Sequence, residues 1–163
     1  RVKEHPGLER TRLKLAGGRM ASDRKFIYRQ MKKIRKAGAA SDVELLNLAG
    51  SGEKKRFLQS LSVMCVPEVH GEACGLYVME AAASGVPSVQ PENGVFPELM
   101  EELEGGHLFP PGDVDALART LIEVLANPDE LRRAGERCRR KMEELFSLEA
   151  TVRRLAEVCA SCC

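Results

Sequence analysis

The sequence has 163 residues, 44% of them hydrophobic, which is enough for one domain with a hydrophobic core. Its 25 Lys and Arg nearly balance 24 Asp and Glu, so the net charge of +1 gives no electrostatic reason to expect binding to nucleic acid or to an anionic membrane. No apolar run reaches the length of a membrane span and no secretory signal is visible. We therefore expect a cytoplasmic protein without a transmembrane segment.

Short apolar runs alternate with segments of helical periodicity along the whole chain. In chain order, the expected elements are a strand at residues 13–17, a helix at 23–38, a strand at 43–48, a helix at 53–61, a strand at 62–67, a helix at 76–85, a strand at 86–91, a short strand within 106–113, and helices at 113–127, 128–146 and about 148–160.

Residues at the ends of several of these helices favour helix starts and stops. Asp23 or Ser22 can cap the helix at 23–38, and Gly38 can end it. Asp113 can cap the helix that follows it, and Pro128 suits the first turn of the next one. These signals support the predicted helix boundaries.

The alternation of strands and helices indicates an α/β fold, a Rossmann-like parallel sheet flanked by helices, in a single domain over residues 1–163. The strand runs are apolar without alternation, which is typical of strands covered on both faces. Ligands of such sheets bind at the carboxyl ends of the strands.

The loop after the strand at 62–67 lies at such an end. It leads into a predicted helix near Gly75, whose first amide groups and positive dipole end suit a phosphate or diphosphate. Glu72 lies in the loop and Glu80 lies within the helix. A carboxylate accepts two hydroxyl hydrogen bonds at once, so the two glutamates suit the diols of ribose and of a sugar. This combination suggests a nucleotide-sugar.

A structural interpretation of these glutamates stays open beside the functional one. Glu72 can be a solvated loop residue or a charge partner of the helix start, and Glu80 can be an exposed helix residue. A hydrolase with paired carboxylates is disfavoured, because no further acidic or His residue nearby clearly completes such a site.

The cysteines raise a separate question. Cys65 lies in an apolar run and suits the core. The C-terminal sequence CASCC contains a C-x-x-C, which is either a zinc or redox site or the frayed end of a helix with incidental thiols. No second C-x-x-C or nearby His completes a ligand set, so we predict no metal site and reduced thiols.

The stretch PEVHGEACGLYVMEAAASGVPSVQPENGVFPEL, residues 67–99, resembles the signature of GT-B glycosyltransferases of family 4. The donor domains of that family carry Glu-x7-Glu, the spacing of Glu72 and Glu80. The segment ENGVFPEL resembles the family's G-x-x-E loop, and HLFPPGDVDALARTL resembles its L-x-P-P-G-D segment. The other matching positions of the central motif are Gly75, Leu76, Ala81, Gly85 and Pro87.

The resemblance implies roles for individual residues in binding a UDP-, GDP- or ADP-sugar without a metal ion or other cofactor. Glu80 would bind the ribose hydroxyls, and Glu72, the catalytic residue, would bind a hydroxyl of the donor sugar. The remaining donor-binding residues would be Cys74, Gly75 and Leu76 through their amides at the distal phosphate and sugar, Leu48 and Ala49 at the base, and Gly94. Cys74 departs from the family, which usually has Phe there.

The resemblance also implies that the chain is the C-terminal half of a GT-B fold, truncated at its N-terminal edge. A strand and the basic Arg and Lys-Gly residues that grip the diphosphate would precede Arg1, and residues 1–12 would be the end of a helix. The acceptor would bind to the missing N-terminal domain of a longer two-domain chain. We expect the piece alone to be inactive in transfer and to self-associate through an exposed sheet edge.

Three functions remain open at this point. The first is the donor-binding half of a retaining glycosyltransferase, a hexosyltransferase in its full-length form, with a nucleotide-sugar as partner and no nucleic acid. The second is a non-catalytic module that binds nucleotide-sugars. The third is an α/β interaction scaffold with idle glutamates. The fold by itself does not discriminate among them.

Overall fold

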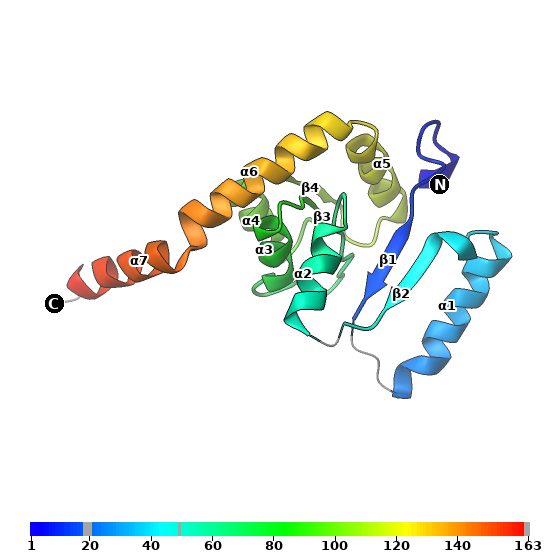
Figure 1. Cartoon of the computed structure of the whole chain (residues 1–163), viewed down its shortest axis with the longest axis horizontal. Helices are drawn as coiled ribbons and strands as arrows, with labels where there is room; N and C mark the ends of the chain where they lie inside the picture. Colours follow the sequence, from blue (N-terminus) through cyan, green and yellow to red (C-terminus); the bar gives the residue numbers. More distant parts are fainter. Residues whose placement is uncertain (18–20, 49, 162–163) are drawn as a thin grey trace. The chain divides into compact units, whose positions relative to one another are not determined.

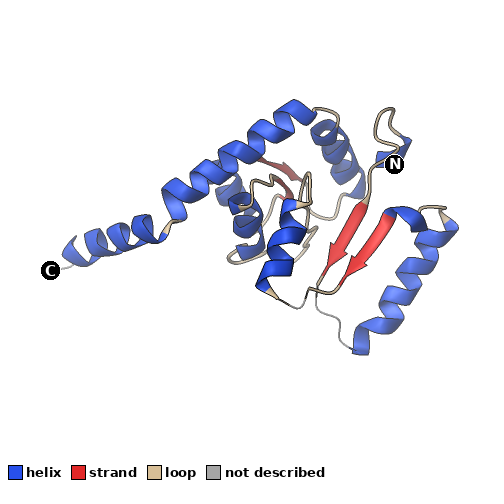
Figure 2. Cartoon of the chain, viewed as in Figure 1, coloured by secondary structure: helices blue, strands red, loops and turns tan. Residues whose placement is uncertain are grey.

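The structure is a computed structural model that describes residues 1–17, 21–48 and 50–161. It divides into two compact units, Arg1–Phe57 and Leu58–Cys163. Parallel strands flanked by helices build both units, which confirms the predicted α/β class (Figures 1 and 2). Within the described ranges, no helix combines the length and the apolar character needed to cross a membrane.

The first unit is built around a β-α-β arrangement. Strand β1 (Leu13–Ala16) pairs in parallel with β2 (Val43–Leu46), and helix α1 (Arg24–Lys36) forms the crossover between them. Helix α2 (Ser51–Gln59) follows β2 and ends in the second unit. The 3-10 turns of this unit are η1 (Val2–Glu4), η2 (Ala21–Asp23) and η3 (Ala40–Asp42).

One local expectation for this unit is wrong. Residues 1–12 do not end an α-helix, because they form η1 and a series of turns in which the amide of Leu8 donates to His5 and that of Thr11 donates to Leu8. Asp23 is the N-cap residue of α1 as predicted, but its side chain makes no capping hydrogen bond to the helix. Gly38 ends α1 as predicted, with a positive φ of 71° and its amide donating to Arg35.

The second unit has β3 (Ser88–Pro91) at its centre. β3 is buried along its whole length and pairs in parallel with β4 (Gly106–Phe109). On its other side, the predicted strand at 62–67 is reduced to one bridge, Met64 to Ser88. The amide of Met64 donates to Pro87 and the amide of Val89 donates to Met64, after which the side chain of Gln90 takes over the pairing. The predicted strand position is therefore right and its regular pairing is short.

Helices α3 (Leu76–Ala83), α4 (Phe96–Leu103) and α5 (Val114–Leu125) pack against this small sheet. Helix α6 (Pro128–Phe146) packs against these helices, and α7 (Leu148–Ser161) follows α6 and is exposed along nearly its whole length. Val89 and Phe109 meet Ala116 and Val124 of α5 in the core. Helix α6 packs against both α3 and α4, and a Cβ on its Gly135 would collide with the carbonyl oxygen of Gly85 (Figure 1).

Two helix starts in this unit follow the predicted caps. The Asp113 carboxylate accepts hydrogen bonds from the amides of Asp115 and Ala116 at 2.9 and 2.8 Å. Asn127 accepts from the amide of Glu130, and Pro128 is the first residue of α6. Helix α4 was not among the expected elements, although Phe96, Leu99, Met100 and Leu103 have helical spacing and are buried.

Candidate functional site

The loop between Met64 and α3 turns sharply at Gly75. This residue has a φ of 66° and is the N-cap of α3, and its carbonyl accepts from the amides of Val78 and Met79. A Cβ there would lie 2.7 Å from the side chain of Leu99 and 3.2 Å from that of Val95. Only glycine fits both the left-handed backbone and the close approach of α4. The position of the first turn of α3 is thus set by Gly75.

The carboxylate of Glu72 lies on the amides that lead into α3. Its Oε1 accepts hydrogen bonds from the amide of Ala73 at 3.0 Å and from that of Cys74 at 3.1 Å. Hydrogen bonds from the backbone of Cys74, then of Gly75, then of Ala73 lower the pKa of Glu72 below its ordinary value. These amides therefore stabilise a negative charge at the start of the helix.

The backbone of Glu72 is held by the turn before α4. The amide of Val95 donates to the carbonyl of Glu72 at 2.9 Å. Gly94 has a φ of 53°, and a Cβ on it would lie 2.6 Å from the amide nitrogen of Glu72 and collide with its carbonyl oxygen. The structure thus brings Gly94 against Glu72, where it supports the loop through its backbone.

The other predicted residues lie in different places. Leu76 and Glu80 are both on α3; Leu76 is the first residue of the helix and is exposed, whereas Glu80 is the fifth and is half-buried. Leu48 follows β2 in the other unit, and Ala49 lies outside the described residues. The assignment of Leu48 and Ala49 to the nucleotide base stays a prediction.

Three buried polar groups around the same loop were missed from the sequence. Within the described part of the chain, Tyr77 Oη, Gln90 Nε2 and Asn93 Oδ1 are buried without a hydrogen-bond partner. Gln90 Oε1 accepts from the amide of Val66, and Asn93 Nδ2 donates to the carbonyl of Glu68. A Gln inside the apolar run VPSVQP was a signal that could have found one of them, because buried polar side chains need partners.

The hydroxyl of Tyr77 is close enough to the loop to sense its charges. Burial raises the pKa of Tyr77, and the carboxylates of Glu72 and Glu68 raise it further. Its ring lies 6.2 Å from that of Phe96, at 56°. Tyr77 thus joins α3 to α4 behind the loop and stays neutral at physiological pH.

The thiols offer no metal centre in the part of the chain that is described. No group of three or more His, Cys, Asp or Glu residues there could hold a metal ion. Cys65 is half-buried and packs against the core, in agreement with its predicted place, and burial raises the pKa of its thiol to about 12. Cys74 is exposed, and Cys162 and Cys163 of the C-terminal cluster lie outside the described residues, so the zinc or redox interpretation stays untested.

The chain resembles known proteins in both its sequence and its structure. The family described as "Glycosyl transferases group 1" matches residues 6–141. The "MMP alpha-(1->4)-mannosyltransferase" of Mycolicibacterium hassiacum is 35% identical over 120 residues, 73% of this chain and 29% of that protein. The "Phosphatidyl-myo-inositol mannosyltransferase" of Mycobacterium leprae is 35% identical over 95 residues, 58% of this chain and 25% of that protein.

Among solved structures, Anabaena Alr3699/HepE in complex with UDP resembles the chain with a TM-score of 0.82. The sequence identity is 18%, and the likeness covers 98% of this chain and 43% of that chain. This likeness confirms the predicted fold. The chain spans less than a third of the length of the two curated relatives.

Proposed function

The chain belongs to the family of glycosyl transferases group 1, and we propose from this that it is the donor-binding half of a retaining glycosyltransferase. The full-length enzyme transfers a sugar from a nucleotide-sugar to an acceptor, which the other half of the protein binds. The family and the GT-B fold agree with the motif in residues 67–99, and the assignment to family 4 is part of the proposal.

The observation that carries the proposal is the negative charge at the start of α3. The amides of Ala73 and Cys74 already bind one anionic oxygen, that of the Glu72 carboxylate. A phosphate oxygen presents the same chemistry to these amides and to the positive end of the helix dipole. The geometry of this loop therefore suits the distal phosphate of a nucleoside diphosphate.

The two glutamates have different roles in this proposal. Glu80 lies one turn into α3, within reach of a ribose whose diphosphate begins at Gly75. Glu72 moves off the amides of Ala73 and Cys74 when a phosphate takes them, and its carboxylate then accepts hydrogen bonds from the donor sugar. Gly94 keeps the backbone of Glu72 in place during this change.

The donor is a UDP-, GDP- or ADP-sugar. Anabaena Alr3699/HepE has been solved with UDP and with UDP-glucose, and this supports UDP as the first nucleotide to test. We include no metal ion or other cofactor, since amides and carboxylates provide the phosphate and hydroxyl contacts that the proposal needs.

The experiment compares two substitutions that keep shape and remove charge. Glu80→Gln replaces one acceptor oxygen at the ribose diol, so we expect it to weaken binding of the bare nucleoside diphosphate by about 1–3 kcal/mol. Glu72→Gln removes the carboxylate that competes with the phosphate for the amides of Ala73 and Cys74, so it should not weaken binding of the bare nucleotide and should weaken binding of the nucleotide-sugar. Titration calorimetry of each variant with a nucleoside diphosphate and with the corresponding nucleotide-sugar measures both changes in affinity.

Glu157→Gln on the exposed face of α7 is the matched control, because it removes the same charge far along the sequence from the loop. Equal loss of bare-nucleotide affinity in the Glu72 and Glu80 variants would contradict the separate roles. Donor binding without any sugar transfer by a chain that includes the acceptor half would favour a non-catalytic binding module instead.

A further inference from the structure

The net charge of +1 hides an uneven distribution along the chain. Residues 1–57 contain sixteen Lys and Arg against six Asp and Glu, a net charge of +10. Residues 58–163 contain nine against eighteen, a net charge of −9. The first range coincides with the first compact unit. The total charge of the chain therefore says little about what this unit attracts.

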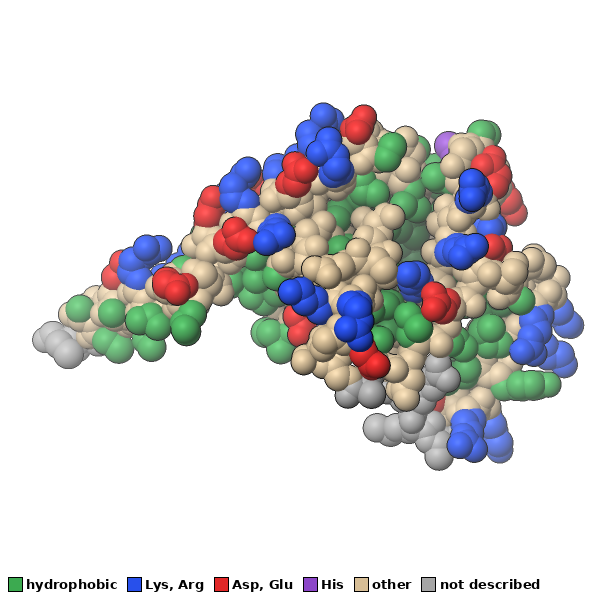
Figure 3. Space-filling view, in the orientation of Figure 1, with side chains coloured by type: hydrophobic (Ala, Val, Ile, Leu, Met, Phe, Trp, Pro, Cys, Tyr) green, Lys and Arg blue, Asp and Glu red, His purple; other side chains and the backbone are tan. Residues whose placement is uncertain are grey.

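Helix α1 concentrates this positive charge. Its 13 residues contain seven basic and no acidic side chains. Within the described ranges, none of the seven has an ion-pair or hydrogen-bond partner. The seven are Arg24, Lys25, Arg29, Lys32, Lys33, Arg35 and Lys36. Figure 3 shows Lys and Arg side chains gathered over this helix.

The two sides of α1 differ in character. Ile27, Met31 and Ile34 have helical spacing and are half-buried, so they form the inner side. Four cations spaced by three or four residues share the outer side. They are Lys25, Arg29, Lys32 and Lys36, all exposed.

Two exposed aromatic side chains flank this row of cations. Phe26 is 56% exposed and Tyr28 is 63% exposed. At 100° per residue, they lie on opposite sides of the row formed by the four cations. Tyr28 combines an apolar ring with a polar hydroxyl, which suits an environment that is apolar on one side and wet on the other, and the ring of Phe26 suits the apolar part of such an environment.

We propose that the outer side of α1 binds the surface of a bilayer that contains anionic phospholipids. The four cations lie along a straight helix of about 20 Å, which matches a flat array of headgroup phosphates. Phe26 and Tyr28 enter the headgroup region on either side. Proteins that bind single-stranded nucleic acid hold its backbone in a positively charged groove, whereas these four cations lie on the outer side of one helix. The proposal goes beyond donor binding and does not depend on it.

The test is co-sedimentation of the 163-residue chain with vesicles. We expect binding to vesicles of phosphatidylcholine with phosphatidylglycerol, release at high salt, and no binding to phosphatidylcholine alone. One variant replaces four residues by Gln: Lys25, Arg29, Lys32 and Lys36. Because each cation near an anionic surface contributes about fivefold in affinity, this variant should bind the vesicles at least about 100-fold more weakly.

The matched control replaces four exposed arginines of the second unit by Gln, which lowers the net charge by the same amount. They are Arg132, Arg139, Arg140 and Arg153. This control should bind the vesicles as the unmodified chain does, and circular dichroism checks that the total helix content is unchanged in both variants. Equal loss in both variants, or equal binding to neutral vesicles, would overturn the proposal. So would binding to duplex DNA or RNA without binding to the anionic vesicles.

Discussion

Residues without side chains hold the Glu72 loop in position. Gly94 contacts the backbone of Glu72 with a positive φ, and Gly75 turns the chain into α3 beside Leu99. A side chain at either position would meet a backbone or a buried side chain at less than van der Waals distance. The candidate site therefore depends on glycines that make no contact through a side chain of their own.

Gly94→Ala should displace Glu72, because its Cβ would collide with the carbonyl of Glu72 and its φ of 53° disfavours any side chain. We expect a loss of stability of about 1–3 kcal/mol and a clear loss of affinity for the nucleotide-sugar. Thermal unfolding and calorimetry measure the two effects.

Gly112→Ala provides the control. Gly112 has a φ of 77°, but a Cβ on it would meet nothing within 4 Å. It should therefore lose stability from backbone strain and keep its affinity for the nucleotide-sugar. Similar affinity losses in both variants would show that Gly94 does not act through Glu72.

Site residues that belong to a motif with regular spacing could be predicted from the sequence. Site residues whose role depends on tertiary contacts could not. Glu72 and Gly75 were found through their position before a helix. The support that Gly94 gives to Glu72 was not predicted, because it comes from a backbone contact between residues that lie 22 positions apart in the sequence. The partners of Gln90 and Asn93 depend on the irregular path of residues 66–68, which no local pattern predicts.

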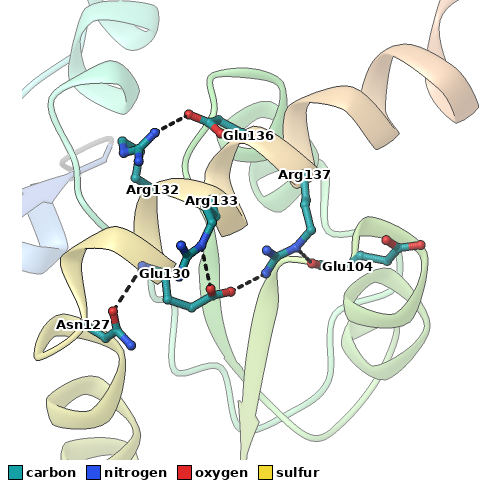
Figure 4. A network of polar contacts seen from close by, with 7 residues as sticks. All are labelled: Glu104, Asn127, Glu130, Arg132, Arg133, Glu136 and Arg137. Carbon is teal, nitrogen blue, oxygen red and sulfur yellow. Dashed lines mark hydrogen bonds and ion pairs between the residues drawn. The ribbon is translucent and has the colours of Figure 1, made fainter.

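Among the elements, α6 is tied to the end of α4 by a polar network (Figure 4). Arg137 donates to Glu130 at 2.7 Å and to the carbonyl of Glu104 at 2.9 Å, and Arg133 donates to Glu130 at 3.0 Å. Lys141 pairs with the carboxylate of Glu104 at 2.6 Å. The carbonyl and the carboxylate of Glu104 thus connect the end of α4 to α6, and Glu130 orients Arg137 within α6.

This network predicts a loss of stability in acid. Hydrogen bonds from Arg137 and then Arg133 lower the pKa of Glu130, and the hydrogen bond from Lys141 lowers that of Glu104, below the ordinary value of 4.5. A carboxylate whose pKa is lowered in the folded state stabilises the fold above pH 4.5. This contribution to stability is lost as the pH falls through the folded-state pKa. Thermal unfolding of the chain should therefore show a falling midpoint below pH 4.5.

Glu130→Gln should remove part of this pH dependence. Glu143→Gln, which breaks an exposed pair with Arg139 on the same helix, is the control and should keep it. An unchanged acid dependence in the Glu130 variant would show that the network does not contribute.

Local sequence signals predicted most elements, and the exceptions have physical reasons. Asp113 and Pro128 were placed correctly at helix starts because their effect is local. Helix α4 was hidden by the Gly, Asn and Pro residues before it, which favour a loop, whereas its buried face is decided by packing on β4 and α6. The strand at 62–67 shrank to one bridge because the side chain of Gln90, not its backbone, pairs with Val66.

At the scale of the whole molecule, the apolar surface of β1 predicts self-association. Leu13 and Leu15 are 50% and 40% exposed, and β2 is the partner of β1 in the described sheet. Unpaired strand edges and apolar patches promote contacts between chains. Sedimentation velocity should show larger species as the concentration rises.

Replacing Leu13 and Leu15 by Lys should shift the chain towards the monomer, since charges protect strand edges. Val114→Lys on α5, at a residue that is 70% exposed, is the control and should leave the association unchanged. A chain that stays monomeric at every concentration would contradict the prediction.

An amide NMR titration of the chain with UDP-glucose, and with GDP- and ADP-sugars, shows whether the amides before α3 bind the diphosphate of a nucleotide-sugar. We expect saturable shifts for the amides of Ala73, Cys74 and Gly75 with at least one donor, while the amides of α6 stay unchanged. The Glu80→Gln variant should need a higher donor concentration to reach saturation. Saturation with every donor that leaves these three amides unshifted, or shifts confined to other helices, would contradict binding at these amides.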